Sequence, residues 1–168
     1  MKKNGIRKLV VLALLIGLNI VFSRILSLSA WNFKISLTFT TLLLAGYLYG
    51  PFYAAVVGGV GDLIGSLLFP IGAYNPLFTL TAVLSGLVFG YFHYDNCELR
   101  NTVTACLINQ LVISLLLNSW FIAMTYRTSF AALLATRALQ SLVMLMIELL
   151  IIRLLEPVLP RLRYILKK

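Results

Sequence analysis

Long apolar blocks run through this chain, and only short polar or glycine- and proline-rich segments separate them. The first block follows Lys8, Gly50 and Pro51 separate the second from the third, and the segment 70–76 ends the third. Gly-Pro pairs and segments with two prolines mark turns rather than helix interiors. The pattern predicts six helices, at residues 8–28, 35–49, 52–69, 77–91, 102–123 and 130–156.

Composition places these helices in a membrane. Hydrophobic residues make up 61% of the chain and charged residues 11%, with a mean hydropathy of +0.97. Each membrane span needs ~20 apolar residues, so the chain has room for about six spans with short loops and for no further soluble domain. Lys2 and Lys3 before an apolar run resemble a secretory signal, but five more apolar segments follow and no small-residue cleavage site closes the first. We therefore expect an all-α integral membrane protein with a single domain over residues 1–168.

Charged residues indicate how the six transmembrane helices are oriented. Six spans place both termini on one side, and ten of the fourteen Lys and Arg residues fall on that side. Cytoplasmic segments are rich in Lys and Arg, so both termini are expected in the cytoplasm. The net charge of +9 is explained by this orientation and by attraction to anionic inner-leaflet lipids, without nucleic acid as a partner. The ten residues are Lys2, Lys3, Arg7, Lys8, Arg100, Arg153, Arg161, Arg163, Lys167 and Lys168.

The other four cations fall at or near the outer face, against the usual charge bias. They are Arg24, Lys34, Arg127 and Arg137, and few acids lie nearby in the sequence to neutralise them. Such a cluster at the mouth of a helical bundle suits an anionic solute. Arg24 and Arg137 lie inside predicted helices and bind carboxylates well through their forked guanidinium groups, so they are the leading anion ligands. Lys34 and Arg127 are better explained as interfacial residues whose charged ends reach water.

Two further residues near the same mouth carry candidate binding chemistry. Asp62 is the one acid that the prediction places in the outer half of the bundle. Its carboxylate can pair with Arg24 or Arg137, accept hydrogen bonds from a donor-rich ligand edge, or do both, because it offers about four lone-pair sites. Tyr74, in the loop 70–76, is the best candidate for stacking on a flat ligand, although an interfacial aromatic belt also explains it.

Catalytic and energy-coupling motifs are not found in the sequence. His93 is the single histidine and has no Cys or Ser partner nearby, and no Gly-rich phosphate loop ends in Gly-Lys-Ser or Gly-Lys-Thr. The cysteines Cys97 and Cys106 match no metal-ligand spacing. We therefore expect no catalytic residue, no metal and no cofactor of the chain's own, and a transport function would need energy from partner proteins.

Two segments carry a resemblance to a known family. The stretch from Phe69 to Leu87, FPIGAYNPLFTLTAVLSGL, and the segment GDLIGSLL from Gly61 resemble the substrate-binding S components of energy-coupling factor (ECF) vitamin transporters, most closely the folate-specific member. The resemblance implies a multi-pass protein of the bacterial cell membrane that binds a vitamin at its outer side. It also implies docking on a membrane T component that two cytoplasmic ATPases drive, so that the partners use the ATP. In the family, helix 1, the loop after it and helices 4 to 6 bind the vitamin. The candidate substrate-binding residues are Arg24, Lys34, Asp62, Gly72, Ala73, Tyr74, Asn75 and Arg137.

The same resemblance implies a docking site on the first helix. The family places two alanines four residues apart there, and Ala13 and Gly17 occupy these positions. Glycine in place of the second alanine keeps this face small but departs from the family pattern. The pair is therefore expected to contact the T component.

Folate matches the candidate residues chemically. It has two carboxylates for Arg24 and Arg137, a flat pterin for Tyr74, and a donor-rich pterin edge for Asp62. The excess of cations argues against thiamine, which is itself cationic, whereas pantothenate, a small monocarboxylate, stays open as an alternative. A small membrane enzyme or a structural membrane protein is the alternative from another class, and a vitamin that co-purifies with the chain would discriminate between them.

Overall fold

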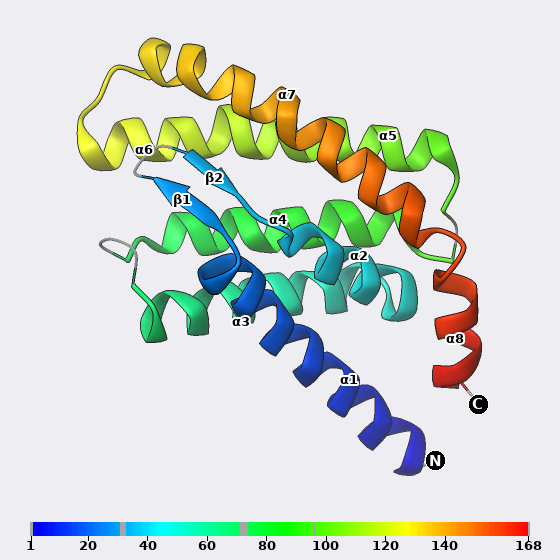
Figure 1. Ribbon diagram of the computed structural model, residues 1–168. Helices are drawn as coiled ribbons and strands as arrows, with labels where there is room; N and C mark the ends of the chain where they lie inside the picture. Colours follow the sequence, from blue (N-terminus) through cyan, green and yellow to red (C-terminus); the bar gives the residue numbers. More distant parts are fainter. Residues whose placement is uncertain (1, 31–32, 71–73, 96, 168) are drawn as a thin grey trace.

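The computed structural model describes residues 2–30, 33–70, 74–95 and 97–167. Most of the described chain is helical, and two long helices contain or continue into π-helical segments (Figure 1). The elements are α1 (Lys2–Ile20), η1 (Val21–Ile25), β1 (Leu28–Ala30), β2 (Phe33–Ile35), α2 (Thr38–Tyr49), α3 (Pro51–Leu68), α4 (Pro76–His93), α5 (Leu99–Leu107), η2 (Ile108–Leu117), α6 (Asn118–Tyr126), α7 (Phe130–Leu155) and α8 (Leu159–Lys167), where η marks the π-helical segments.

Five of these helical stretches are long and apolar enough to cross a membrane. They are Gly5–Ile25, Pro51–Leu68, Pro76–His93, Leu99–Tyr126 and Phe130–Leu155. The sixth apolar helix, α2, has 12 residues and is shorter than the ~20 that a span requires. The helical membrane architecture agrees with the sequence prediction, while the sixth span stays a prediction.

Both termini lie at the same end of the helical bundle (Figure 1). The turn between α2 and α3 lies at that end, whereas the hairpin β1–β2 and the turn between α6 and α7 lie at the opposite end. The six spans predicted from the sequence would produce this arrangement.

The first loop contains a β-hairpin that the all-α prediction did not include. Strands β1 and β2 pair antiparallel, with Leu28 opposite Ile35 and Ser29 opposite Lys34. Each strand has three residues, which is too short for the alternating pattern that reveals a strand in a sequence. The predicted first helix, which extended to residue 28, instead ends with η1 at Ile25.

The basic C-terminal segment folds back as α8, another helix that the sequence pattern did not predict. Arg163 of α8 forms an ion pair with Asp95 and lies 5.5 Å from the ring centroid of Tyr47. Leu159 is 1% exposed and belongs to the hydrophobic core. Near this end of the bundle, burial and the neighbouring Glu156 raise the pKa of the Cys97 thiol to about 11. A protonated, half-buried thiol is typical of a structural rather than a reactive cysteine.

Glycines let helices α2, α3 and α4 approach closely. A Cβ added at Gly46 would lie 2.5 Å from Gly90 Cα, and one at Gly58 would lie 2.5 Å from the carbonyl oxygen of Ala82. Such distances leave no room for a side chain, so these small residues form the packing seam between the three helices. Gly17 differs, because a Cβ there would meet no atom within 4 Å.

Replacing Gly86 with alanine is expected to destabilise the bundle by about 1–3 kcal/mol, the usual effect of overpacking a filled interface. The new Cβ would lie 2.6 Å from the carbonyl carbon of Ala54 and 2.7 Å from Ala55 Cα, and backbone cannot move aside as a flexible side chain can. Thermal unfolding of the detergent-purified protein measures the effect. Gly17→Ala is the matched control. Equal melting temperatures of Gly86→Ala and Gly17→Ala would contradict the close packing of α4 against α3 at Gly86.

Candidate functional site

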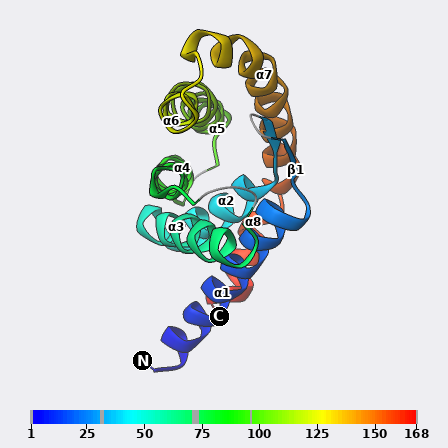
Figure 2. The ribbon, with the colours of Figure 1, turned by 90° about the vertical axis from the view of Figure 1, so that its left-hand side faces the viewer.

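A cavity of about 420 Å³ lies inside the bundle. This volume is within the range of small-molecule sites. Its lining residues come from α1, η1, α2, α3, α4, η2, α6 and α7. Viewed from the hairpin end, α3, α4 and α6 lie on one side of the bundle, and α7 and β1 lie on the other (Figure 2). Segments that are far apart in the sequence therefore build one site.

At one wall of the cavity, a chain of polar contacts joins η1, α3 and α4. Arg24 donates from a terminal guanidinium nitrogen to Asp62 Oδ1 at 3.3 Å. Thr79 Oγ1 donates to Asp62 Oδ2 at 2.9 Å, and the Tyr74 hydroxyl lies 3.4 Å from Thr79 Oγ1. The ion pair that we expected for Asp62 is therefore present with Arg24, and both carboxylate oxygens already accept a hydrogen bond.

The local backbone places the Arg24 guanidinium at the cavity. Arg24 lies in the π-helical segment η1, and π-helical turns occur frequently at functional sites. Gly65 on α3 leaves space for the side chain, because a Cβ there would lie 3.3 Å from Arg24 Nε. That Nε is buried and has no hydrogen-bond partner among the described residues.

Arg137 reaches the same cavity from α7. It is 7% exposed, and its Nε is buried without a partner among the described residues. The structure shows no ion pair for Arg137 among the residues whose side chains it describes. A buried cation is stable only when a charge or a set of hydrogen bonds compensates it, so Arg137 is suited to bind an anion.

Tyr74 and Asn75 line the cavity where the loop enters α4. Tyr74 is 44% exposed, as expected of a residue at a mouth. Asn75 accepts a hydrogen bond from the Leu77 N–H at 3.0 Å and so caps α4, and its Nδ2 donates to Thr125 Oγ1 at 2.7 Å. The structure therefore assigns Asn75 a bridging contact between α4 and α6 as well as a place in the lining.

Three of the predicted binding residues have no described side chain. Gly72 and Ala73 lie outside the described residues. The backbone of Lys34 forms part of β2, opposite Ser29, and its side chain is not described. Their roles in binding stay predictions.

The buried polar end of this cavity was not predicted from the sequence. Glu148 on α7 is 1% exposed and lines the cavity. Its Oε1 accepts hydrogen bonds from Asn109 Nδ2 at 3.0 Å and from Gln110 Nε2 at 2.7 Å, both on η2. The available signal was spacing, because Arg137, Gln140, Met144 and Glu148 recur every three or four residues on one face of α7.

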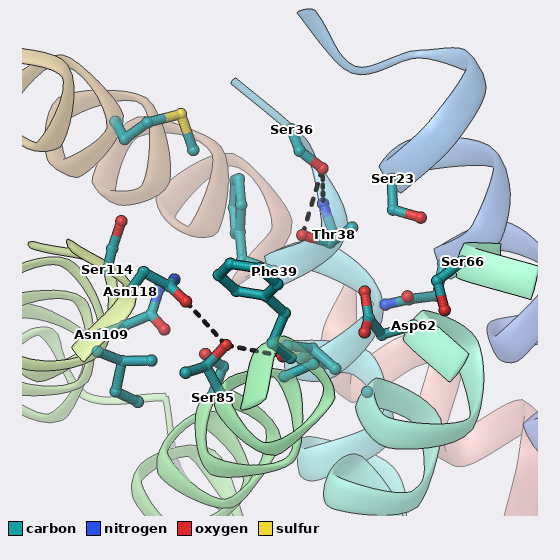
Figure 3. A pocket seen from close by; sticks show the side chains of 18 of the residues that line it. Ser23, Ser36, Thr38, Phe39, Asp62, Ser66, Ser85, Asn109, Ser114 and Asn118 are labelled. Carbon is teal, nitrogen blue, oxygen red and sulfur yellow. Dashed lines mark hydrogen bonds between the residues drawn. The ribbon is translucent and has the colours of Figure 1, made fainter. Parts of the chain in front are cut away.

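Polar side chains face the cavity from two directions (Figure 3). Asn109, Ser114 and Asn118 lie on one side, and Ser23, Asp62 and Ser66 lie on the other, with the ring of Phe39 between the two groups. The ring centroids of Phe39 and Phe89 are 6.4 Å apart, and both rings line the cavity. The site thus combines cations, acids and flat apolar surfaces, as a large amphipathic ligand requires.

The sequence model of the ECF-type riboflavin transporter S component family matches residues 3–162. The chain belongs to this family of S components. The family consists of transporter components rather than enzymes, so the chain is a multi-pass membrane protein of a transporter, as the sequence analysis predicted.

Two curated relatives of this S component are both named folate transporter FolT. The protein from Clostridium novyi is 29% identical over 153 residues, which cover 90% of this chain and 88% of the relative. The protein from Leuconostoc mesenteroides is 31% identical over 153 residues, covering 87% and 82%. A crystal structure of FolT bound with folic acid superposes with a TM-score of 0.81 at 30% identity, covering 87% of this chain and 89% of that one.

Proposed function

We propose that this S component binds folate at the outer side of a bacterial cell membrane and delivers it inward. The observation that carries the proposal is the buried Arg137, which has no ion-pair partner among the described side chains, in a cavity that also holds Arg24. Folate supplies two carboxylates for these guanidinium groups and a pterin for the aromatic surfaces. The FolT relatives and the folic-acid-bound FolT structure support this choice of ligand.

Arg137 is the stronger candidate for a direct ligand carboxylate contact. Arg24 shares its charge with Asp62, so part of its attraction for an anion is already neutralised. Tyr74 lies where it can cover the ligand at the mouth, and the loop residues Gly72 and Ala73 belong to the same proposed binding set. Lys34 and Asn75 complete that set on the strength of the resemblance.

Riboflavin is the competing ligand, because the matching family carries its name. Riboflavin is uncharged and would bring no anion to Arg137, which has no ion-pair partner among the described side chains. Pantothenate has one carboxylate and no flat ring, so it would use less of the site. The charge and aromatic content of the cavity favour folate over both.

Transport requires partners in this proposal. The chain forms one domain with six spans and cytoplasmic termini, since the termini carry most of the cations. A membrane T component and two cytoplasmic ATPases supply the energy, because the sequence contains no phosphate-binding loop. Ala13 and Gly17 on α1, which are both exposed, form the contact with the T component.

Titration calorimetry of the detergent-purified chain with folate, riboflavin and pantothenate tests the proposal. Folate is expected to bind most tightly, and vesicles that contain the chain alone are expected to show no ATP-driven uptake. Uptake should begin when the T component and the ATPases are added. Tighter binding of riboflavin, or ATP-driven uptake by the chain alone, would overturn the proposal.

A further inference from the structure

The cavity holds two acids, and they differ in what they still offer to a ligand. Both oxygens of Asp62 already accept hydrogen bonds, from Arg24 and from Thr79. In Glu148, both amide donors bind Oε1, while Oε2 is buried without a hydrogen-bond partner among the described residues. The Cys106 thiol, a weak donor, lies beside the same carboxyl group. Glu148 therefore has the acceptor that is still available.

A second acceptor belongs to Gln110, a side chain that is hydrogen-bonded to Glu148. Gln110 donates through Nε2 to Glu148 at 2.7 Å, and its own Oε1 is buried without a partner in the described part of the chain. Buried polar atoms are nearly always hydrogen-bonded, and exceptions in a native structure call for a ligand, water or ion. Glu148 Oε2 and Gln110 Oε1, here called the acceptor pair, are two buried acceptors on hydrogen-bonded side chains that line the same cavity.

Helix α7 fixes how far the acceptor pair lies from the cationic end of the site. Glu148 follows Arg137 by 11 residues, which corresponds to about 16 Å along an α-helix and returns to nearly the same face. This distance is comparable to the length of an extended folate molecule. One ligand can therefore reach both residues, with its anionic end at Arg137 and its other end at Glu148.

The pterin ring has the edge that this acceptor pair requires. In its amide form, the ring presents the N3–H and the 2-amino group side by side, so the two donors call for two acceptors, which Glu148 Oε2 and Gln110 Oε1 supply. Phe39 and Phe89 line the cavity and offer flat surfaces for the ring. The carboxylate and aromatic groups thus complement the edge and the face of the same ring.

We propose that Glu148, assisted by the Gln110 carbonyl oxygen, binds the donor edge of the pterin, so that folate enters ring first and leaves its glutamate tail at Arg137. This assignment rests on the proposed folate function and moves the recognition of the pterin edge from Asp62 to Glu148. It also predicts selectivity, because a ligand without the donor edge leaves two buried acceptors unpaired.

Affinity measurements with Glu148→Gln and three ligands test the assignment. Folate should bind Glu148→Gln ~10–150-fold more weakly than wild type, the range for a lost charge-assisted hydrogen bond. Removing the 2-amino group from folate should weaken binding to wild type by a similar factor and should change binding to Glu148→Gln little, since the two changes remove one interaction. p-Aminobenzoylglutamate, which lacks the pterin, should bind both proteins equally.

Two control variants separate this assignment from a general loss of charge. Glu156→Gln removes an acid that pairs with Arg153 at the surface, and it should bind folate as wild type does. Asp62→Asn should keep the wild-type preference for folate over 2-desamino folate. If Asp62→Asn loses that preference and Glu148→Gln keeps it, Asp62 binds the pterin edge and the proposal is wrong.

The outcomes distinguish failure of the proposed folate function from failure of the Glu148 assignment. Failure of wild type to bind folate would overturn the proposed function. Binding of folate by wild type with an unchanged affinity in Glu148→Gln would overturn only the assignment of Glu148. Should Glu148→Gln melt before it can be titrated, wild type alone decides, because equal affinity for folate and 2-desamino folate excludes recognition of this edge.

Discussion

Replacing Arg137 with alanine is expected to weaken folate binding by ~10–150-fold, which corresponds to the ~1.5–3 kcal/mol of a charge-assisted hydrogen bond. The guanidinium is 7% exposed and lacks an ion-pair partner among the described side chains, so a ligand carboxylate would be its principal counter-charge. Arg137→Lys should recover only part of the affinity because the forked geometry is lost. Calorimetry on the purified variants measures both effects.

Arg24 needs a double variant, because Arg24→Ala also leaves Asp62 without its partner. If Arg24 binds a ligand carboxylate, Arg24→Ala with Asp62→Asn should bind folate as weakly as Arg24→Ala alone. If Arg24 only neutralises Asp62, the double variant should bind as wild type does. Wild-type affinity in both Arg137→Ala and the double variant would show that neither arginine holds the carboxylates.

The helical part of the fold could be predicted from the apolar blocks, because turn residues at Gly50 and in the segment 70–76 separate these blocks. The hairpin β1–β2 could not, since its strands have three residues each and depend on pairing with one another. Helix α8 was missed because its sequence is short and basic, so it gives no membrane-type apolar run. Its ion pair from Arg163 to Asp95 is a tertiary contact between distant segments.

The candidate site was predictable where charge alone was informative. Arg24, Asp62 and Arg137 were identified because ionisable groups are rare in membrane helices, and all three line the cavity. The buried end was missed because Asn109 and Gln110 resemble ordinary interhelical hydrogen-bond partners in a sequence. Their convergence on Glu148 depends on how η2 packs against α7, which no local pattern specifies.

Helix α1 presents a surface that the rest of the bundle does not cover. Ala13 and Gly17 are both exposed, and a Cβ at Gly17 would meet no atom within 4 Å. Ala131 and Ala135 on α7 are a second exposed pair with the same spacing, so they provide an internal comparison.

Replacing Gly17 with leucine is expected to abolish co-purification with the T component and to stop ATP-driven folate uptake in vesicles. A small pair permits close backbone approach between helices, and a leucine at this position would hold the partner helix away. Folate binding to the isolated variant should stay at the wild-type level, because the added side chain enters open space outside the cavity.

A pull-down and a folate titration on the same preparation measure the two properties separately. Ala135→Leu is the matched control, because it adds the same bulk to the equally exposed pair on α7, and it should leave both properties unchanged. An intact complex in Gly17→Leu would show that docking uses another surface. Loss of folate binding with the complex intact would show that this face of α1 contributes to the binding site, because only a change at the cavity can weaken the ligand without weakening the assembly.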